Sequence, residues 1–205
     1  MSKWLQAVLF DFDGTLTRPG SLDFNTIRRA VKCPAGIPIL EHIETLATDE
    51  PRKRAIRILE QYELEAAKRS QPNAGAEDLI VFLKSLQLKL GILTRNSLNS
   101  VSVALMNFSR VQESDFNAII TRHDPARPKP HPESVLLAAS RLGVAPDKIL
   151  VVGDYVFDIE AGQQAGAQTV FLHTSATTRL PDPPADYTIK VLNELKAIFG
   201  PSIEL

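Results

Sequence analysis

The chain has 205 residues, of which 44% are hydrophobic and 23% are charged, and its formal net charge is −1. This composition is typical of a soluble globular protein, and the near-neutral charge gives no electrostatic reason to expect nucleic acid or an anionic membrane as a partner. Cys33 is the single cysteine, the first residues lack a secretion signal, and no apolar run reaches the length of about 18 residues that a membrane-spanning helix needs, so we expect a cytoplasmic protein.

Short apolar runs alternate with longer segments of helical spacing along most of the chain. The runs predict buried strands at residues 7–10, 88–93, 118–121, 149–152 and 169–172, with a short last one at 187–189. The segments between and after them predict helices at residues 76–86, 98–106, 132–142, 158–165 and 191–199. This alternation predicts an α/β fold with a doubly wound parallel sheet, in which ligands bind at the carboxyl ends of the strands.

Residues 18–73 interrupt this alternation. They contain no convincing strand and at least two helical segments, at residues 24–31 and 50–70, separated by a stretch rich in proline and glycine. We therefore predict a helical insertion at residues 18–73 within a main domain formed by residues 1–17 and 74–205. An exposed apolar face on residues 37–46 would favour an interface between copies of the chain, and the sequence leaves the oligomeric state open.

The run Asp11-Phe12-Asp13-Gly14-Thr15 follows the first predicted strand. Side chains alternate along an extended segment, so Asp11 and Asp13 point to the same side. Two neighbouring carboxylates at the end of a buried strand require a cation or a shared proton, which indicates a catalytic site. The alternative is a hydrophobic strand that closes in an Asp-Gly turn.

Three further polar clusters follow predicted strands. Thr94-Arg95-Asn96 offers a hydroxyl and free N–H groups to an anion, although threonine and asparagine are also common helix caps. Prolines surround Lys129 and restrict its backbone, which suits either phosphate binding or a stiff surface loop. Asp154 ends a strand, and Asp158 lies near the start of the next helix, where an acidic residue is favourable in any case. Together with the first motif, these residues suit Mg²⁺ and a phosphate.

The ordered set of motifs resembles the haloacid dehalogenase superfamily. The resemblance rests on Asp11-Phe12-Asp13-Gly14-Thr15, Thr94, Lys129 and Gly153-Asp154 with Asp158, and it covers residues 7–172. The helical insertion has the placement of the cap found in phosphoglycolate phosphatase and β-phosphoglucomutase relatives. The resemblance therefore implies a Rossmann-like catalytic core with a small helical cap.

The resemblance also implies an activity, namely the Mg²⁺-dependent hydrolysis of a small phosphate monoester, phosphoglycolate-like or a sugar phosphate. Asp11 would attack phosphorus to form an aspartyl-phosphate, and Asp13 would act first as acid and then as base. The presence of Asp13 favours a C–O–P bond over the substrates of dehalogenases proper and of phosphonate hydrolases. The expected partner is a small phosphorylated metabolite.

The remaining motif residues receive binding roles from the same resemblance. Mg²⁺ would be held by Asp11, by the backbone carbonyl of Asp13 and by Asp154, and Asp158 would orient Lys129 or a metal-bound water. Lys129 and Thr94 would bind the phosphate. Arg95 is a further candidate for this role, with a salt bridge on the helix face as the alternative.

Substrate choice is expected to lie in the inserted cap. Arg18 and Lys32 are candidates for contact with a substrate carboxylate, and both are equally compatible with an exposed surface position. Two other functions stay open. A phosphomutase would return the phosphoryl group to another substrate hydroxyl before water arrives, and a non-catalytic module would use the same fold for binding alone.

Overall fold

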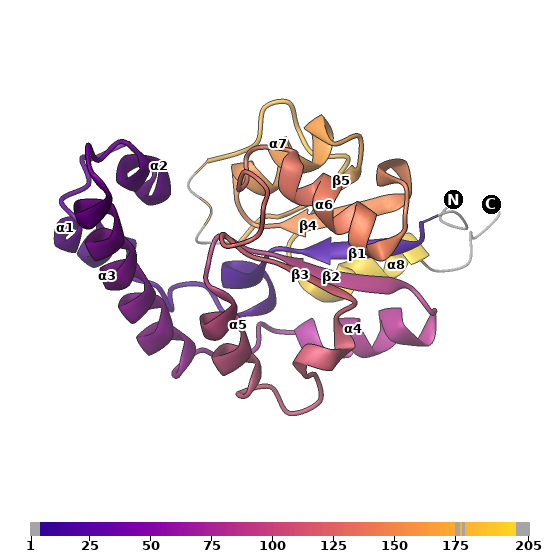
Figure 1. The fold of residues 1–205 in the computed structure, drawn as a ribbon. Helices are drawn as coiled ribbons and strands as arrows, with labels where there is room; N and C mark the ends of the chain where they lie inside the picture. Colours follow the sequence, from indigo (N-terminus) through magenta and orange to yellow (C-terminus); the bar gives the residue numbers. More distant parts are fainter. Residues whose placement is uncertain (1–4, 175–176, 178, 200–205) are drawn as a thin grey trace.

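The computed structural model describes residues 5–174, 177 and 179–199. Its centre is a six-stranded sheet in which every neighbouring pair of strands is parallel (Figure 1). The strands are β1 (Ala7–Phe10), β2 (Lys89–Leu93), β3 (Ala118–Ile120), β4 (Ile149–Gly153), β5 (Gln168–Leu172) and β6 (Tyr187–Ile189). Their spatial order is β3-β2-β1-β4-β5-β6, which confirms the predicted doubly wound sheet.

Five helices cover the two faces of this sheet. They are α4 (Ala76–Ser85), α5 (Leu98–Leu105), α6 (Glu133–Leu142), α7 (Val156–Gln164) and α8 (Lys196–Phe199). Figure 1 shows α6 and α7 on one face and α4, α5 and α8 on the other. The helix predicted at residues 191–199 is divided into a tighter turn at Leu192–Leu195 and the short α8.

Strand β1 lies in the middle of the sheet and shows why these residues form a buried strand. Val8 and Phe10 pack into the hydrophobic cluster beneath α4 and α5, whereas Ala7 and Leu9 pack into the cluster beneath α6 and α7. Because successive side chains of a strand point to opposite faces, a parallel strand covered on both sides must be apolar throughout. The following residue, Asp11, still donates its N–H to Val152 O at 2.8 Å, so it is held at the edge where β1 ends.

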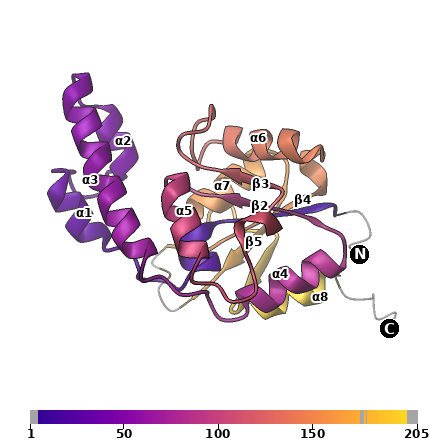
Figure 2. The ribbon, with the colours of Figure 1, turned by 60° about the horizontal axis from the view of Figure 1, so that its bottom comes forward.

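Residues 18–73, which we call the cap segment, form three helices beyond the edge at which the strands end (Figures 1 and 2). They are α1 (Phe24–Ala30), α2 (Ile39–Glu44) and α3 (Asp49–Ala67). The two segments that connect the cap segment to the sheet domain lie side by side, since Arg18 N donates to Gln71 O at 2.9 Å and Asn73 N donates to Leu16 O at 2.8 Å. The cap segment also has a hydrophobic cluster of its own.

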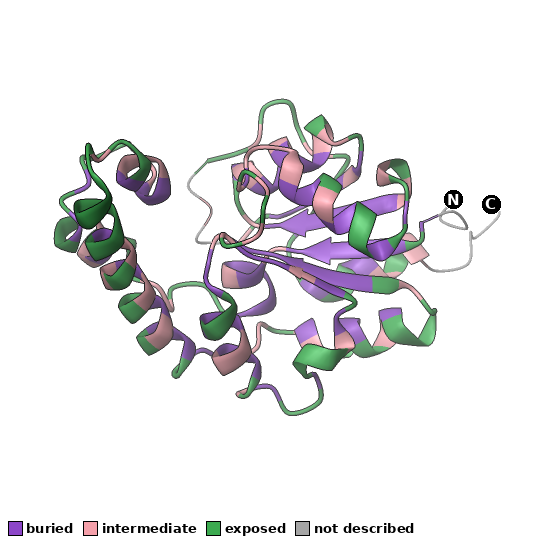
Figure 3. Ribbon diagram, viewed as in Figure 1, coloured by how far each residue is buried: buried purple, intermediate pink, exposed green. Residues whose placement is uncertain are grey.

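Helix α2 was not predicted as a separate element. Ile39, Leu40 and Ile43 are buried in the cluster of the cap segment, so this part of residues 37–46 does not form an exposed apolar face. Ile37 remains exposed. Figure 3 shows that burial is concentrated in the strands and in the inner faces of the helices around them. No helix in the described part of the chain is long and apolar enough to cross a bilayer.

Candidate active site

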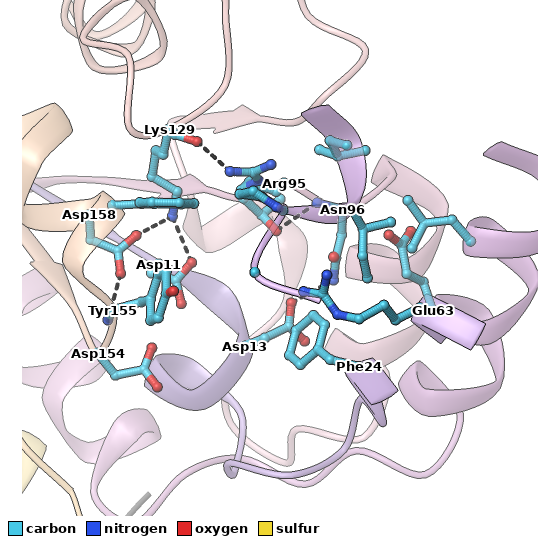
Figure 4. A pocket seen from close by; sticks show the side chains of 18 residues that line it. Asp11, Asp13, Phe24, Glu63, Arg95, Asn96, Lys129, Asp154, Tyr155 and Asp158 are labelled. Atoms are coloured by element: carbon cyan, nitrogen blue, oxygen red, sulfur yellow. Dashed lines mark hydrogen bonds and ion pairs between the residues drawn. The ribbon is translucent and has the colours of Figure 1, made fainter. Parts of the chain in front are cut away.

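The loops that follow the strands bring the predicted polar residues into one pocket (Figure 4). Asp11 follows β1, Thr94 follows β2 and Asp154 follows β4, while Lys129 comes from the loop between β3 and α6. The pocket has a volume of about 490 Å³ and extends from these residues to the cap segment. Of the residues predicted from the sequence, it is lined by Asp11, Asp13, Thr94, Arg95, Lys129, Asp154 and Asp158.

A sharp turn after β1 places two of the carboxylates. Gly14 adopts φ +88°, and a Cβ atom at this position would lie 2.9 Å from Asp154 Cγ and closer still to one of its oxygens. Only glycine therefore allows this approach without displacing Asp154. Thr15 Oγ1 donates to Asp154 Oδ1 at 3.3 Å, and Asn73 Nδ2 donates to the carbonyls of Gly14 and Thr15 at 3.2 and 2.9 Å. The turn is thus held by Asp154 and by the end of the cap segment.

Lys129 is buried and uses all three of its N–H donors. They point to Asp11 Oδ1 at 2.7 Å, Asp158 Oδ1 at 2.5 Å and Leu93 O at 2.8 Å. Burial lowers the pKa of Lys129, but the two carboxylates outweigh this effect and raise the pKa overall, so the ammonium stays charged. Asp158 Oδ2 also accepts the N–H of Tyr155 at 3.0 Å, so the Asp158 side chain caps the start of α7 and also orients Lys129.

The carboxylates outnumber the cations at this end of the pocket. Oxygens of Asp11, Asp154 and Asp158 lie within 4.8 Å of one another. Burial, followed by the charges of Asp11 and Asp158, raises the pKa of Asp154 to about 8. Burial also raises the pKa of Asp11 to about 6, although Lys129 opposes the shift. Among the described residues Asp154 has no cationic partner. A group of oxygen donors with excess negative charge fits a hard divalent cation.

Asp13 lies beside these residues in a different environment. Asn96 Nδ2 donates to Asp13 Oδ2 at 2.6 Å, and the N–H of Asn96 donates to Thr94 Oγ1 at 3.1 Å. Burial, followed by the charges of Asp11 and Glu63, raises the pKa of Asp13 to about 7. A carboxyl group with a pKa in this range can donate and accept a proton near neutral pH. The sequence placed Asn96 in a polar cluster but did not predict its contact with Asp13.

Arg95 points across the pocket toward the cap segment. Its Nη1 donates to the carbonyl of Lys129 at 2.7 Å, and its Nη2 pairs with Glu41 Oε2 of α2 at 2.6 Å. The guanidinium also lies 5.2 Å from the centre of the Phe157 ring. The arginine therefore lines the pocket and forms a salt bridge, but the salt bridge joins the sheet domain to α2 rather than two turns of one helix.

A second ion pair between the sheet domain and the cap segment was not predicted. Glu63 of α3 accepts hydrogen bonds from Arg122 at 2.5 and 2.8 Å, and it also accepts the N–H of Ser97 at 3.4 Å. Arg122 donates in turn to the carbonyl of Arg95 at 3.0 Å. Both partners of this pair are buried at their charged ends, and together they hold the backbone of the loop that carries Asn96.

The two substrate candidates proposed in the cap segment do not line the pocket. Arg18 is exposed and donates to Pro72 O at 3.3 Å, where the cap segment returns to the sheet. Lys32 is exposed in the turn after α1, with φ +55°. The residues of the cap segment that do line the pocket are Phe24, Arg28, Gly36, Pro38, Ile39, Leu40, Leu59 and Glu63. Their positions depend on how the three helices pack, which no local pattern specifies.

Comparison with known proteins gives one family and a set of named relatives. Residues 8–172 match the family model described as haloacid dehalogenase-like hydrolase. An uncharacterized hydrolase of Saccharomyces cerevisiae is 36% identical to the chain, over 83% of this chain and 78% of the relative. The N-acetylmuramic acid 6-phosphate phosphatase of Pseudomonas aeruginosa is 30% identical, over 80% of each chain.

Two solved structures illustrate the fold that the chain shares with known proteins. A predicted phosphoglycolate phosphatase from Haemophilus somnus superposes with a TM-score of 0.74 at 20% identity, over 98% of this chain and all of that one. CbbY from Rhodobacter sphaeroides, solved in complex with phosphate, gives 0.71 at 24% identity, over 93% and 96% of the two chains. At these identities the structural comparisons establish the shared fold.

Proposed function

Because this chain belongs to the haloacid dehalogenase-like hydrolase family, we propose that it is a Mg²⁺-dependent phosphatase that hydrolyses a small phosphate monoester. The observation that carries the proposal is the meeting of Asp11, Asp13, Lys129 and Asp154 in one pocket, although they lie up to 143 residues apart in the sequence. A relative that is named as a phosphatase of a sugar acid phosphate supports the same substrate class.

Asp11 is the nucleophile in this proposal. Lys129 holds its Oδ1, which leaves Oδ2 to attack the phosphorus of the substrate. The new Asp11–phosphorus bond forms as the bond between phosphorus and the leaving oxygen breaks. The electron pair of the broken bond stays on the leaving oxygen, which takes the proton of Asp13 and departs as an alcohol.

The same residues complete the reaction in a second step. Asp13, now a carboxylate, removes a proton from a water molecule as that water attacks the phosphorus of the aspartyl-phosphate. The bond between Asp11 and phosphorus breaks with its electron pair on the Asp11 oxygen, so the Asp11 carboxylate is regenerated and inorganic phosphate leaves. Asn96 keeps Asp13 oriented in both steps through its 2.6 Å hydrogen bond. The raised pKa of Asp13 suits an acid that must later act as a base.

The negative charge of the site requires compensation before an anionic phosphate can approach. Asp11, Asp154 and the backbone carbonyl of Asp13 would hold Mg²⁺, which when bound supplies Lewis-acid stabilisation of the phosphoryl oxygens. Lys129 and the hydroxyl of Thr94 add a positive charge and a hydrogen-bond donor. In this proposal residues 1–17 and 74–205 form the catalytic core, and residues 18–73 form a cap that contacts the leaving group.

Release of inorganic phosphate from a panel of phosphate monoesters tests the proposal. The wild-type enzyme with Mg²⁺ should hydrolyse at least one ester, and both EDTA and the Asp11→Asn variant should abolish turnover. Asp147→Asn is the matched control, because this aspartate is exposed and does not line the pocket. Turnover by Asp11→Asn at the wild-type rate would overturn the proposal, as would a wild-type enzyme that releases no phosphate from any ester.

A further inference from the structure

Arg28 of α1 lines the part of the pocket formed by the cap segment. Its Nη1 donates to Pro34 O at 2.7 Å and also to Ile37 O, and it lies 3.3 Å from Cys33 Sγ. These contacts fix the guanidinium against the loop between α1 and α2. They do not neutralise its charge, because all three acceptors are uncharged groups.

The other charged groups that line the pocket wall next to the cap segment have partners of opposite charge. Arg95 pairs with Glu41, and Glu63 pairs with Arg122. Arg28 is different, since no carboxylate in the described part of the chain forms an ion pair with it. The neighbouring pocket wall is largely apolar and is formed by Phe24, Ile39, Leu40 and Leu59. An arginine in such surroundings attracts an anion more strongly than it would in open water.

We propose that Arg28 binds a carboxylate on the leaving-group part of the substrate and thereby makes the enzyme specific for acidic phosphate monoesters. This inference rests on the proposed function, because the phosphate at Asp11 fixes where the rest of the substrate lies. With the phosphate at the strand ends, the leaving group extends into the remainder of the pocket, whose far wall is the cap segment (Figure 4).

The charge available favours a carboxylate over a second phosphate. A carboxylate carries one negative charge, which one guanidinium matches and binds through two parallel hydrogen bonds. A second phosphate would bring about −1.5 to −2 charges at pH 7, and Arg28 is the one cation without an acidic partner among the described residues that line the pocket. Arg18 and Lys32 do not reach this wall.

Matched pairs of esters test the role of Arg28 in specificity. Phosphoglycolate is compared with 2-hydroxyethyl phosphate, and 3-phosphoglycerate with glycerol 3-phosphate, because the members of each pair differ in a carboxylate against a hydroxymethyl group. We expect the wild-type enzyme to give a kcat/KM at least tenfold higher for the acidic member of one pair. Arg28→Gln should lower that ratio at least tenfold, whereas Arg28→Lys, which retains the charge, should keep part of it.

Arg29→Gln is the control for these variants. Arg29 lies on the same helix, is exposed and donates to Thr26 Oγ1 at 2.9 Å, so its replacement should leave the ratio unchanged. A purely structural role of Arg28 in holding the loop would lower kcat/KM for both members of a pair equally. A wild-type enzyme without preference for the acidic member of either pair, or an Arg28→Gln variant that keeps the preference, overturns the proposal.

A binding measurement separates this proposal from the proposed function. If the wild-type enzyme hydrolyses none of the four esters, the proposed phosphatase activity does not extend to these substrates. The affinity of the Asp11→Asn variant for each ester, measured by calorimetry, then decides the role of Arg28. The assignment is supported if the Asp11→Asn variant binds an acidic ester more tightly than the hydroxymethyl ester of the same pair, and if adding Arg28→Gln removes this difference. Equal affinity for the two members of both pairs overturns it.

Discussion

Replacing Arg122 with methionine would break the buried ion pair that joins the sheet domain to the cap segment. The side chains of Arg122 and Glu63 are only 5% and 3% exposed, and their charged ends are joined at 2.5 and 2.8 Å. Methionine retains an apolar side chain of similar reach. It leaves the carboxylate of Glu63 buried without a cation, and it removes the hydrogen bond to the carbonyl of Arg95.

The expected loss of stability is large and depends on pH. Removing one partner of a buried pair costs about 3–5 kcal/mol, which lowers the melting temperature of a chain of this size by about 6–20 °C. Burial already raises the pKa of Glu63, and without Arg122 this pKa rises further. The folded state then keeps a proton that the unfolded state has lost. The free energy of unfolding therefore falls as pH rises from the pKa of Glu63 in the unfolded state to its higher pKa in the folded state, by at most about 1.4 kcal/mol per pH unit.

Urea unfolding followed by circular dichroism at pH 5 and pH 8 measures this effect. The penalty of Arg122→Met should be greater at pH 8. Arg110→Met is the control, because Arg110 and Asp78 form an ion pair whose side chains are 53% and 54% exposed, and an exposed pair contributes at most about 1 kcal/mol. Adding Glu63→Leu to Arg122→Met should restore most of the stability. An Arg122→Met penalty no larger than that of the control, or a double variant as unstable as the sum of the single ones, would refute the reasoning.

Three further predictions concern the catalytic end of the pocket. Gly14 and Gly20 both adopt φ +88°, but only a Cβ at Gly14 would collide with Asp154. Gly14→Ala should therefore lower kcat/KM by about 10²-fold, whereas Gly20→Ala should leave kcat/KM unchanged. Equal losses of kcat/KM in the two variants would contradict the role of the close approach between Gly14 and Asp154. Asp13→Asn should lower kcat/KM for an alkyl phosphate by about 10²–10⁴-fold but lower it much less for p-nitrophenyl phosphate, because kcat/KM reports formation of the aspartyl-phosphate and the p-nitrophenolate leaving group needs no proton. Steady-state kinetics on both esters gives the two kcat/KM values, and an equal loss of kcat/KM would argue against Asp13 as the acid, whereas kcat should fall for both esters because Asp13 also activates the water. Mg²⁺ at 100 times its dissociation constant should stabilise the wild-type protein by about 2.7 kcal/mol, measured as a shift of the melting temperature. The Asp154→Asn variant should lose this shift, and its persistence would place the cation elsewhere.

The sheet and the grouping of Asp11 with Asp154 could be predicted because both depend on local sequence signals. The run Ala7–Phe10 is apolar at every position, which is what a strand buried on both faces requires. Parallel strands end at the same edge of a sheet, so polar residues that follow several strands must meet there. Asp11 and Asp154 therefore lie close together. The local sequence around each residue predicts this proximity but not the distance between their carboxylates.

The contacts of the cap segment could not be predicted in the same way. Glu63 belongs to a helix rich in charges, which indicates a solvated face in the sequence, and its partner Arg122 lies 59 residues further along the chain. Helix α2 has six residues, too few for a helical period to stand out, and it begins directly after Pro38. Arg28 resembles its neighbour Arg29 in sequence, and only the packing of α1 in the cap segment, where it contacts α3, distinguishes the two.

Two of the ion pairs between the cap segment and the sheet domain meet the loop of residues 94–97. Arg95 supplies its side chain to Glu41, and Arg122 binds the carbonyl of Arg95 while it pairs with Glu63. The two attachments differ in strength. The pair at α2 is 21% and 38% exposed and contributes at most about 1 kcal/mol, whereas the pair at α3 is almost completely buried. Of these two pairs, the one at α2 is therefore the easier to break, whereas the pair at α3 holds the cap segment firmly beside Asn96.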